Sequence, residues 1–521
     1  MNFANEIENA LNSINKQEHS YTENGAVAFK YAPKAILDMN YQLNSLRNAS
    51  YKEIGEYFSK VFYEEETSVA MKFFFWILDM REGAGERNIS KGIMKWMIDN
   101  HCDILEKIYE YIPEYGRWDI LILLADPHFN INESFRLQVI KFIERQLVYD
   151  LKQISKSKSS ISLLGKWMPS ENASSKETIR MARQLMRDLN IKPKTYRKAL
   201  MLLRKKLNVV EVDMSSNHWK DIQYEIVPSK ANLNYSDAFL RHDEERRREY
   251  LNKVVKGESK INAKVVAPYE IVKYYSGIYY NVVNPYNETL EQMWKALPQY
   301  QLDNILVVRD GSGSMINRIG NTKVTCLQVA TSLAVYAAEH NKGIWKDKFI
   351  TFSSKPQFIN LSKCSSLKEK LEVCSRYNDY SNTDIYKTMK LILNTAINNG
   401  CKQKDMPKSI LIVSDMQFDD FHGYYGRLEH GTFNYDKVLF ESIKTEYMAA
   451  GYKLPRIIFW NVNNRGNKTI PLQENELGLV LCSGFSTNIF KMVLGNEVDP
   501  YKQLLKVLNS ERYSFIDECL S

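Results

Sequence analysis

The sequence predicts two structural regions, a largely α-helical N-terminal region and an open α/β domain after it. As far as residue 290, apolar residues recur at helical spacing, and short polar or glycine-containing turns separate the segments. After residue 300, continuous apolar runs typical of buried parallel strands alternate with helical stretches. We therefore expect a helical domain over residues 1–295 and a doubly wound, mostly parallel α/β domain over residues 296–521.

The helical region is supported by its periodicity and by its stop signals. Residues 50–65 place Ile54, Phe58 and Phe62 on one helical stripe, and residues 68–82 are apolar almost all round, as in a buried helix. Glycines break the pattern after that segment, and helical spacing then resumes. This rhythm of helix, short turn and helix favours stacked helical pairs, as in a solenoid.

The helical region also carries a local excess of positive charge. Residues 151–206 contain 15 lysines and arginines but only three acids, while the whole chain has a formal net charge of +8. Such a field attracts a phosphate backbone, although a solvated helical face gives the same composition. Trp167 and Trp219 are candidates for stacking on unpaired bases or, alternatively, for core anchors. The candidate RNA-binding residues are Arg180, Arg183, Arg187, Lys192, Lys194, Arg197, Lys198, Arg204, Lys205 and Lys206.

Size and composition exclude several classes of protein. The chain has 521 residues, 44% of them apolar, which is enough for large cores. No apolar run reaches the ~18 residues of a membrane span, so we expect no membrane partner, and the start lacks the layout of a secretion signal. Seven scattered cysteines without a CxxC pair predict reduced thiols and a cytoplasmic location, and the eight histidines form no zinc-binding pattern.

The α/β region is defined by its alternation of strands and helices. Ligands of an open α/β sheet bind at the carboxyl ends of its strands, so the ends of these segments are the places to search for a site. We expect strands within residues 304–310, 347–354, 409–415, 456–463 and 477–484, and helices within residues 325–340, 366–377, 436–451 and 486–495.

Acidic and hydroxyl side chains occur at two of these strand ends. Asp310 closes the first strand, Ser312 and Ser314 follow in the turn, and Asp415 closes the strand at 409–415. Because the carboxyl ends of parallel strands share one edge of a sheet, we expect these side chains to converge. Carboxylate and hydroxyl oxygens without imidazole or thiol suit Mg²⁺ or Mn²⁺. An aspartate before a glycine is otherwise a turn former or a helix cap.

One more hydroxyl is expected from the loop between these strands. Thr383 lies there, just before a helix, and we take it as the last ligand. We expect the neighbouring Asp384 beside the site rather than among its ligands. The predicted metal ligands are Asp310, Ser312, Ser314, Thr383 and Asp415.

The stretch "DGSGSM" at 310–315 fits the DxSxS signature of the von Willebrand factor A domain, and the chain resembles that family. The resemblance implies a metal-ion-dependent adhesion site in which Ser312, Ser314 and Thr383 are hydroxyl ligands. It further implies that Asp310 and Asp415 bind the metal directly or through water. One coordination position would stay open for water or for an acidic group of a partner.

The segment "DMREGAGER" at 79–87, followed by an A-type domain, resembles the TROVE-domain proteins of the Ro autoantigen class. The match is closer to an uncharacterised relative of that class, which shares segments similar to "EYGRWDILI", "LGKWMPS", "WKDIQYEIVPS", "FLRHDEERRREYL" and "SGFSTNIFKMVL". This resemblance implies a ring or crescent of HEAT-like helical repeats that binds RNA, closed by a von Willebrand factor A domain of Rossmann-like, doubly wound topology.

Three functions are compatible with these features, and we favour the first. It is a non-catalytic, Ro-like ribonucleoprotein that binds small structured or misfolded RNA through its basic surface, with an Mg²⁺- or Mn²⁺-binding A domain for ring closure or partner docking. The alternative is a metal-dependent protein–protein adaptor without RNA binding, whose metal takes an acidic group of the partner. A metal-dependent hydrolase is disfavoured, because the motifs supply neither a histidine nor a general base.

Overall fold

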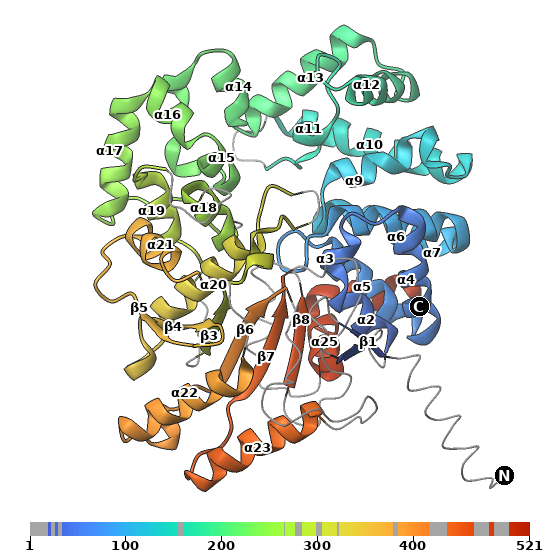
Figure 1. The fold of residues 1–521 in the computed structure, drawn as a ribbon. Coiled ribbons are helices and arrows are strands. Elements are labelled where there is room, and N and C mark those ends of the chain that lie inside the picture. The colour runs from blue at the N-terminus through green and yellow to red at the C-terminus, as the bar shows by residue number, and fades with distance from the viewer. Residues whose placement is uncertain are drawn as a thin grey trace, which may run out of the picture. The chain divides into compact units, whose positions relative to one another are not determined.

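The computed structural model describes residues 19–21, 27–29, 34–154, 156, 160–264, 266–276, 284–298, 305–319, 322–378, 384–415, 435–462, 479–483 and 500–521. The chain is mixed α/β and mostly helical, with an N-terminal helical region and a C-terminal mixed sheet (Figure 1). Two compact units are formed. The sheet unit comprises residues 1–48 and 266–507, and the helical unit comprises residues 49–265 and 508–521.

The units do not divide the chain at one point. Residues 266–295 pack with the sheet, and the last residues, 508–521, pack with the helices. The sequence suggests a domain boundary between residues 295 and 296, and that boundary stays a prediction. By their contacts, residues 266–295 group with the sheet and residues 508–521 with the helices.

The sheet unit is built on six strands in the order β5-β4-β3-β6-β7-β8. Every neighbouring pair is parallel except the β4–β5 pair at one edge, which is antiparallel. In order of appearance along the chain this is 3-2-1-4-5-6, the order of a doubly wound sheet, and the direction of winding reverses between β3 and β6. The strands are β3 (Ile305–Asp310), β4 (Lys348–Phe352), β5 (Phe358–Asn360), β6 (Ser409–Ser414), β7 (Arg456–Asn461) and β8 (Leu479–Ser483).

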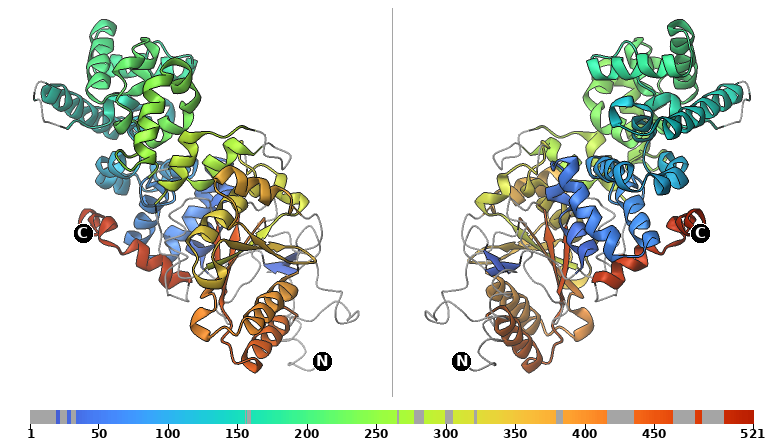
Figure 2. Two further views of the ribbon diagram at one scale, coloured as in Figure 1. Left: turned by 90° about the vertical axis from the view of Figure 1, so that its left-hand side faces the viewer. Right: turned by 90° about the vertical axis from the view of Figure 1, so that its right-hand side faces the viewer.

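Helices cover both faces of this sheet, as continuous apolar strands require. Leu306 and Val308 of β3 belong to a core cluster with buried residues of α22 (Ile385–Asn398) and α23 (Tyr435–Ala449), which are orange in Figures 1 and 2. Arg309, the next residue of β3 after Val308, donates a hydrogen bond to Thr331 of α20 (Cys326–His340). Its side chain therefore lies on the other face of the sheet. Alternate side chains of the strand therefore serve two different helical layers.

The remaining elements of the sheet unit flank this framework. α18 packs on α20, and α2 contacts β8. The expected helix at 486–495 lies outside the described residues. The other elements are β1 (His19–Tyr21), β2 (Val27–Phe29), α2 (Ala35–Tyr41), α3 (Leu43–Leu46), α18 (Pro268–Tyr275), α19 (Glu288–Lys295), α21 (Leu367–Ser375) and α25 (Pro500–Leu508), whose last residue falls in the helical unit.

The helical unit is an array of short helices joined by turns. α5 is buried over residues 70–78, as its almost wholly apolar sequence predicts, and the amphipathic α4 buries Ile54, Phe58 and Phe62. Contacts join α4 with α6, α10 with α13, and α16 with α17. The HEAT-like character of this array stays a prediction. Its α-helices are α4 (Tyr51–Glu64), α5 (Thr67–Leu78), α6 (Arg87–Asn100), α7 (Cys102–Ile108), α8 (Ile112–Tyr115), α9 (Trp118–Ile122), α10 (Glu133–Ile154), α11 (Leu164–Trp167), α12 (Lys176–Asp188), α13 (Pro193–Lys206), α14 (Val210–Ser215), α15 (Ser229–Asn234), α16 (Ser236–His242), α17 (Glu244–Val255) and α26 (Phe515–Leu520).

The glycine-rich turn after α5 is tightly folded. A Cβ on Gly83 would lie 2.0 Å from the carbonyl oxygen of Trp76, and Gly85 has a positive φ of 68°, so both positions require glycine. The Asp79 carboxylate accepts the backbone N–H groups of Arg81 and Glu82 at 2.8 and 3.2 Å. The "DMREGAGER" segment thus builds a structural turn. No helix in the described part of the chain is long and apolar enough to cross a membrane.

Candidate functional site

Two aspartates meet where the winding of the sheet reverses. Asp310 is the last residue of β3, and Asp415 directly follows β6, the parallel neighbour of β3. Both carboxylates are buried, with 2% and 0% exposure. The carboxyl ends of strands at such a reversal form the ligand-binding crevice of open α/β sheets. We call Asp310, Ser312, Ser314 and Asp415 the sheet-edge site.

Hydrogen bonds connect all members of the sheet-edge site. The backbone N–H of Ser312 donates to Oδ1 of Asp310 at 2.8 Å. The hydroxyl oxygens of Ser312 and Ser314 are 3.1 Å apart, and Ser314 donates to Oδ1 of Asp415 at 3.1 Å. Four residues that the sequence places on two separate strand ends, 101 positions apart at the Ser314–Asp415 contact, therefore lie in one cluster.

Ser414 is a member of this environment that the sequence analysis missed. Its hydroxyl donates to Oδ2 of Asp310 at 2.6 Å, so both oxygens of that carboxylate are fixed. The signal was available, because Ser414 is the last residue of β6 and shares the strand end with Asp415. A small hydroxyl at that position can reach across to the neighbouring parallel strand.

Burial raises the pKa of Asp310. Desolvation raises the pKa of its carboxyl above the ordinary value, and the hydrogen bonds from Ser414 and Ser312 and the charge of Arg309 only partly oppose that rise. A buried carboxylate is costly without a compensating positive charge. A cation placed beside it would supply that charge.

The donors of the sheet-edge site fit a hard divalent cation. They are two carboxylates and two hydroxyls, which are oxygen ligands of the kind that Mg²⁺ and Mn²⁺ prefer. Among the described residues, no group of three or more histidine, cysteine, aspartate or glutamate side chains could hold a metal ion. The sheet-edge site has two such side chains and would draw its remaining protein donors from serine hydroxyls.

The third predicted hydroxyl, Thr383, lies outside the described residues. Its neighbour Asp384 begins α22 as a helix cap: Oδ1 accepts the backbone N–H of Lys387 at 2.8 Å, and Oδ2 is 3.1 Å from Lys387 Nζ. These contacts give Asp384 a role in starting the helix that follows the loop.

A buried arginine also contributes to this end of the sheet. Arg309 is 1% exposed, and its guanidinium donates to the carbonyl oxygens of Cys374 and Tyr377 at 3.4 and 2.8 Å. It also donates to the hydroxyl of Thr331 at 3.2 Å. Arg309 thus anchors the end of α21 and the residues directly after it. A charged residue inside an apolar strand signals such partners, because an unpaired buried charge is costly.

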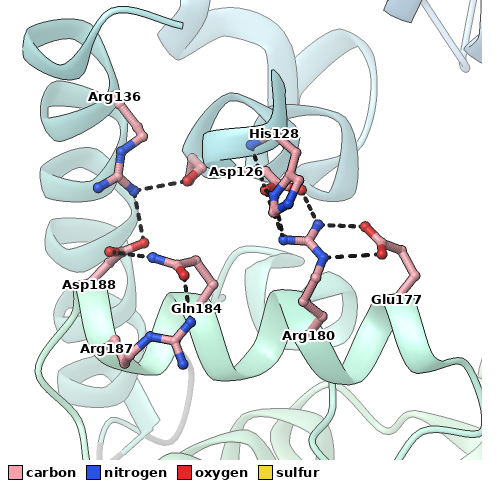
Figure 3. A network of polar contacts seen from close by, with 9 residues as sticks. Asp126, His128, Arg136, Glu177, Arg180, Gln184, Arg187 and Asp188 are labelled. Carbon is pink, nitrogen blue, oxygen red and sulfur yellow. Dashed lines mark hydrogen bonds and ion pairs between the residues drawn. The ribbon is translucent and has the colours of Figure 1, made fainter. Parts of the chain in front are cut away.

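The basic stretch forms α12 and α13, and some of its arginines are engaged within the protein. Arg180 contacts the carboxylates of Asp126 and Glu177 and lies 2.9 Å from Nδ1 of His128 (Figure 3). The positive charge of this guanidinium is therefore already paired with two carboxylates. Arg197 pairs with Glu171 at 2.7 Å.

Arg204 has a structural role. Its guanidinium donates to the carbonyl oxygens of Gly165 and Met168 at 3.0 and 2.9 Å and to the hydroxyl of Ser170 at 2.8 Å. Burial lowers the pKa of Arg204. The side chain therefore ties α13 to the end of α11 and offers few donors to a ligand.

Most of the other candidate RNA-binding residues are exposed and form a basic surface on α12 and α13. Lys194, Lys198 and Lys205 are exposed and share one face of α13 with Met201, which is 55% exposed. No ion pair involving these lysines occurs among the described residues. Lys206 is half-buried, and Arg187 donates to the side chain of Gln184 at 2.6 Å. The exposed candidates are Arg183, Arg187, Lys192, Lys194, Lys198 and Lys205, together with Arg197, which pairs with Glu171.

The two candidate stacking tryptophans already have ring partners. Trp219 stacks on His242 with ring centroids 4.3 Å apart, and its Nε1 donates to Asn217 at 2.8 Å. The guanidinium carbon of Arg117 lies 3.9 Å from the centroid of Trp167. Both rings are half-buried, so the structure gives each a packing role without covering it completely.

Comparison with known proteins relates the chain to two domain families and a viral protein. Residues 304–513 match the model described as Domain of unknown function (DUF7788), and residues 129–305 match Domain of unknown function (DUF2828). An uncharacterized protein of Acanthamoeba polyphaga mimivirus is 28% identical over 530 residues, which span 94% of this chain and 87% of that protein. The two matched segments meet where β3 begins, so strands β3–β8 and helices α10–α19 lie in segments that are similar to two separate domain families.

Proposed function

We propose that the sheet-edge site binds Mg²⁺ or Mn²⁺ and thereby docks an acidic group of a partner protein, in the manner of a von Willebrand factor A domain. The observation that carries this proposal is the convergence of Asp310, Ser312, Ser314 and Asp415 at the point where the winding of the sheet reverses, with contacts of 2.8–3.1 Å. The resemblance of the "DGSGSM" stretch to the A-domain signature supports it. The proposed function is binding without catalysis.

The protein groups have distinct parts in this function. Asp310 is held at both oxygens by Ser414 and by the backbone of Ser312, so its orientation is set before a cation arrives. Ser314 joins the two strand ends through its contact with Asp415. A bound divalent cation would supply positive charge to the two buried carboxylates and a coordination position for an incoming carboxylate.

A peptide array tests the docking function. The full chain, loaded with Mn²⁺, is applied to immobilised peptides that differ by single Asp→Asn or Glu→Gln changes. We expect binding that requires one acidic residue, that chelation abolishes, and that Asp415→Asn also abolishes. Asp384→Asn is the matched control, because Asp384 caps a helix near the site. Peptide binding that persists after chelation would contradict the proposal.

We also propose RNA binding by the helical unit, as in a Ro-like ribonucleoprotein. The observation that favours this second function is the set of exposed basic residues on α12 and α13 that are not matched by acidic partners, including Lys194, Lys198 and Lys205. Contacts between lysines and phosphates release counterions, so affinity should fall steeply as salt rises. The resemblance to TROVE-domain proteins supports structured or misfolded RNA as the ligand.

Salt-dependent RNA binding tests this second function. We expect the triple change of Lys194, Lys198 and Lys205 to glutamine to weaken binding and to reduce the slope of log affinity against log salt by up to about three. Chelation and Asp310→Asn should leave this binding intact. Loss of binding after chelation, or an unchanged slope in the triple variant, would refute RNA binding by this surface.

A further inference from the structure

A second group of cations lies on the helical unit, away from α12 and α13 in sequence. Arg87 and Lys91 are one turn apart on α6, and Arg117 directly precedes α9. Asp119 contacts both arginines, and Glu86 directly precedes Arg87 as the N-cap residue of α6. We call Arg87, Lys91 and Arg117 the α6–α9 cluster.

Asp119 is shared between two of the three cations. Arg117 Nε lies 2.8 Å from Oδ1 of Asp119, and the Arg117 Nη2 group contacts Oδ2. Arg87 Nη2 lies 3.4 Å from the same Oδ2. The single carboxylate thus lies between two guanidinium groups, and the cluster keeps an excess of positive charge.

Unlike Arg87 and Arg117, Lys91 makes no hydrogen bond or ion pair within the described residues. Burial, followed by the charge of Arg87, lowers the pKa of Lys91, while Asp119 acts in the opposite direction. Arg87 shows the same pattern: burial and then Arg117 lower its pKa. The partial burial of Lys91 and the repulsion among the three cations cost folding free energy. Their assembly at one place is therefore better explained by an anionic ligand than by stability.

The backbone and an aromatic ring add to this environment. Arg87 is the first residue of α6, which has 14 residues, and the N-terminal turn of a helix favours a negative charge. The Arg117 guanidinium carbon lies 3.9 Å from the ring centroid of Trp167, and Lys166 Nζ lies 5.7 Å from the same centroid. Arg117 is thus held between the Trp167 ring and Asp119, with its planar fork fixed before a ligand binds.

We propose that Arg87, Lys91 and Arg117 form a binding site for a phosphate group, carried either by a free nucleotide or by an RNA strand. Guanidinium groups donate paired hydrogen bonds to phosphate oxygens, and the Lys91 ammonium adds a charged donor. The Trp167 ring beside Arg117 offers an apolar surface to a base attached to that phosphate. The cations of this site are not those of the α12–α13 surface, and the site does not depend on the metal function.

Ligand-induced stabilisation tests the proposal on the full chain. The melting temperature is measured with inorganic phosphate, with AMP, and with short RNA bearing either a 5′-phosphate or a 5′-hydroxyl, all at one ionic strength set with chloride. Lys91→Gln is the test variant, because Lys91 makes no hydrogen bond or ion pair within the described part of the chain. Lys95→Gln is the matched control, since Lys95 lies one turn further along α6 and pairs with Asp99 at 2.6 Å.

We expect phosphate-bearing ligands to raise the melting temperature of the wild type and of Lys95→Gln. Lys91→Gln should bind them about tenfold or more weakly, as expected for loss of a charged hydrogen bond, and should melt higher than the wild type without ligand because repulsion is relieved. Arg87→Gln, at a side chain that is 45% exposed, gives a second test with the same expected direction for affinity.

The arms of the experiment separate the two sources of phosphate. Stabilisation by AMP and inorganic phosphate that depends on Lys91 identifies a free nucleotide or phosphate as the ligand. Stabilisation by 5′-phosphorylated RNA but not by its 5′-hydroxyl form identifies an RNA end. Equal stabilisation of Lys91→Gln and the wild type by every phosphate ligand, or no stabilisation beyond that given by chloride, would overturn the proposal.

Discussion

Arg512 donates hydrogen bonds to both carboxylate oxygens of Asp79, which lies 433 positions earlier in the chain. Tyr513 donates to the same carboxylate at 3.1 Å, and Asp79 is fully buried. Phe515 stacks on Tyr115 with ring centroids 4.9 Å apart. The last residues of the chain therefore complete the core of the helical unit around the turn that follows α5.

Replacing Arg512 should destabilise the helical unit. In Arg512→Ala the buried Asp79 carboxylate loses its charged partner, and we expect the free energy of unfolding to fall by roughly 3 kcal/mol. Urea denaturation followed by circular dichroism measures this. The control is Glu511→Ala at the exposed neighbouring position, where the change should stay within about 0.5 kcal/mol. Equal stability of the two variants would show that the Asp79–Arg512 contact is unimportant.

A close helix approach should make Gly165 intolerant of a side chain. A Cβ at Gly165 would lie 2.5 Å from Cβ of Leu203, so α11 and α13 would have to separate. We expect Gly165→Ala to lower stability by about 1–3 kcal/mol, whereas Ser174→Ala in the exposed loop should have little effect. Thermal unfolding of the two variants gives the comparison, and an unchanged melting temperature for Gly165→Ala would contradict this packing.

Substitutions of two adjacent basic residues of α13 should have different effects, one on stability and the other on RNA binding. Arg204→Met removes donors to three acceptors in α11 and the residues after it, and it should cost roughly 2 kcal/mol of stability. Lys205→Met, at the exposed neighbouring position, should leave stability unchanged and weaken RNA binding. Urea titration and RNA titration of both variants check this. Lower stability of Lys205→Met than of Arg204→Met would reverse the assignment.

The Asp126–Arg180 pair should make stability depend on pH in the acid range. Burial raises the pKa of Asp126, but hydrogen bonds from Arg180 and His128 outweigh it and lower the pKa below the ordinary value of 3.8. A pKa that is lowered by folding adds stability above the unfolded value, and this stability is lost as pH falls through the folded pKa. Asp126→Asn should therefore be less stable than the wild type near pH 7 by roughly 2 kcal/mol.

The difference between Asp126→Asn and the wild type should shrink as pH falls below about 3.8, because the wild-type carboxylate then becomes protonated. Urea midpoints measured from neutral pH to about pH 3 follow this change. A difference that stays constant across the range would show that the Asp126 charge does not contribute through Arg180 and His128.

The sheet-edge site could be predicted from the sequence because its signals are local. Asp310 and Asp415 each end an apolar run, and parallel strands bring their carboxyl ends to one edge whatever the length of the chain between them. Ser312 and Ser314 follow within four residues of Asp310, so the turn carries them along. Thr383 was inferred from its place between the two strands, just before a helix, and it lies outside the described residues.

The roles of the basic residues could not be predicted in the same way. Arg180 and Arg204 look like their exposed neighbours in sequence, but their partners, Asp126 and the carbonyl of Gly165, are 54 and 39 positions away. Only tertiary packing brings these groups together. The contact of Arg512 with Asp79 is hidden for the same reason, because nothing local to either residue indicates the other.

Isothermal titration of Mn²⁺ into the metal-free full chain tests the central claim most directly. The account predicts one site per chain and affinity reduced by more than about tenfold in Asp310→Asn, Asp415→Asn and Thr383→Val, with Asp384→Asn unchanged as the control. Thr383→Val additionally tests the one predicted ligand that lies outside the described residues. The absence of Mn²⁺ binding by the wild type, or wild-type affinity in both Asp310→Asn and Asp415→Asn, would contradict a metal site at this edge of the sheet.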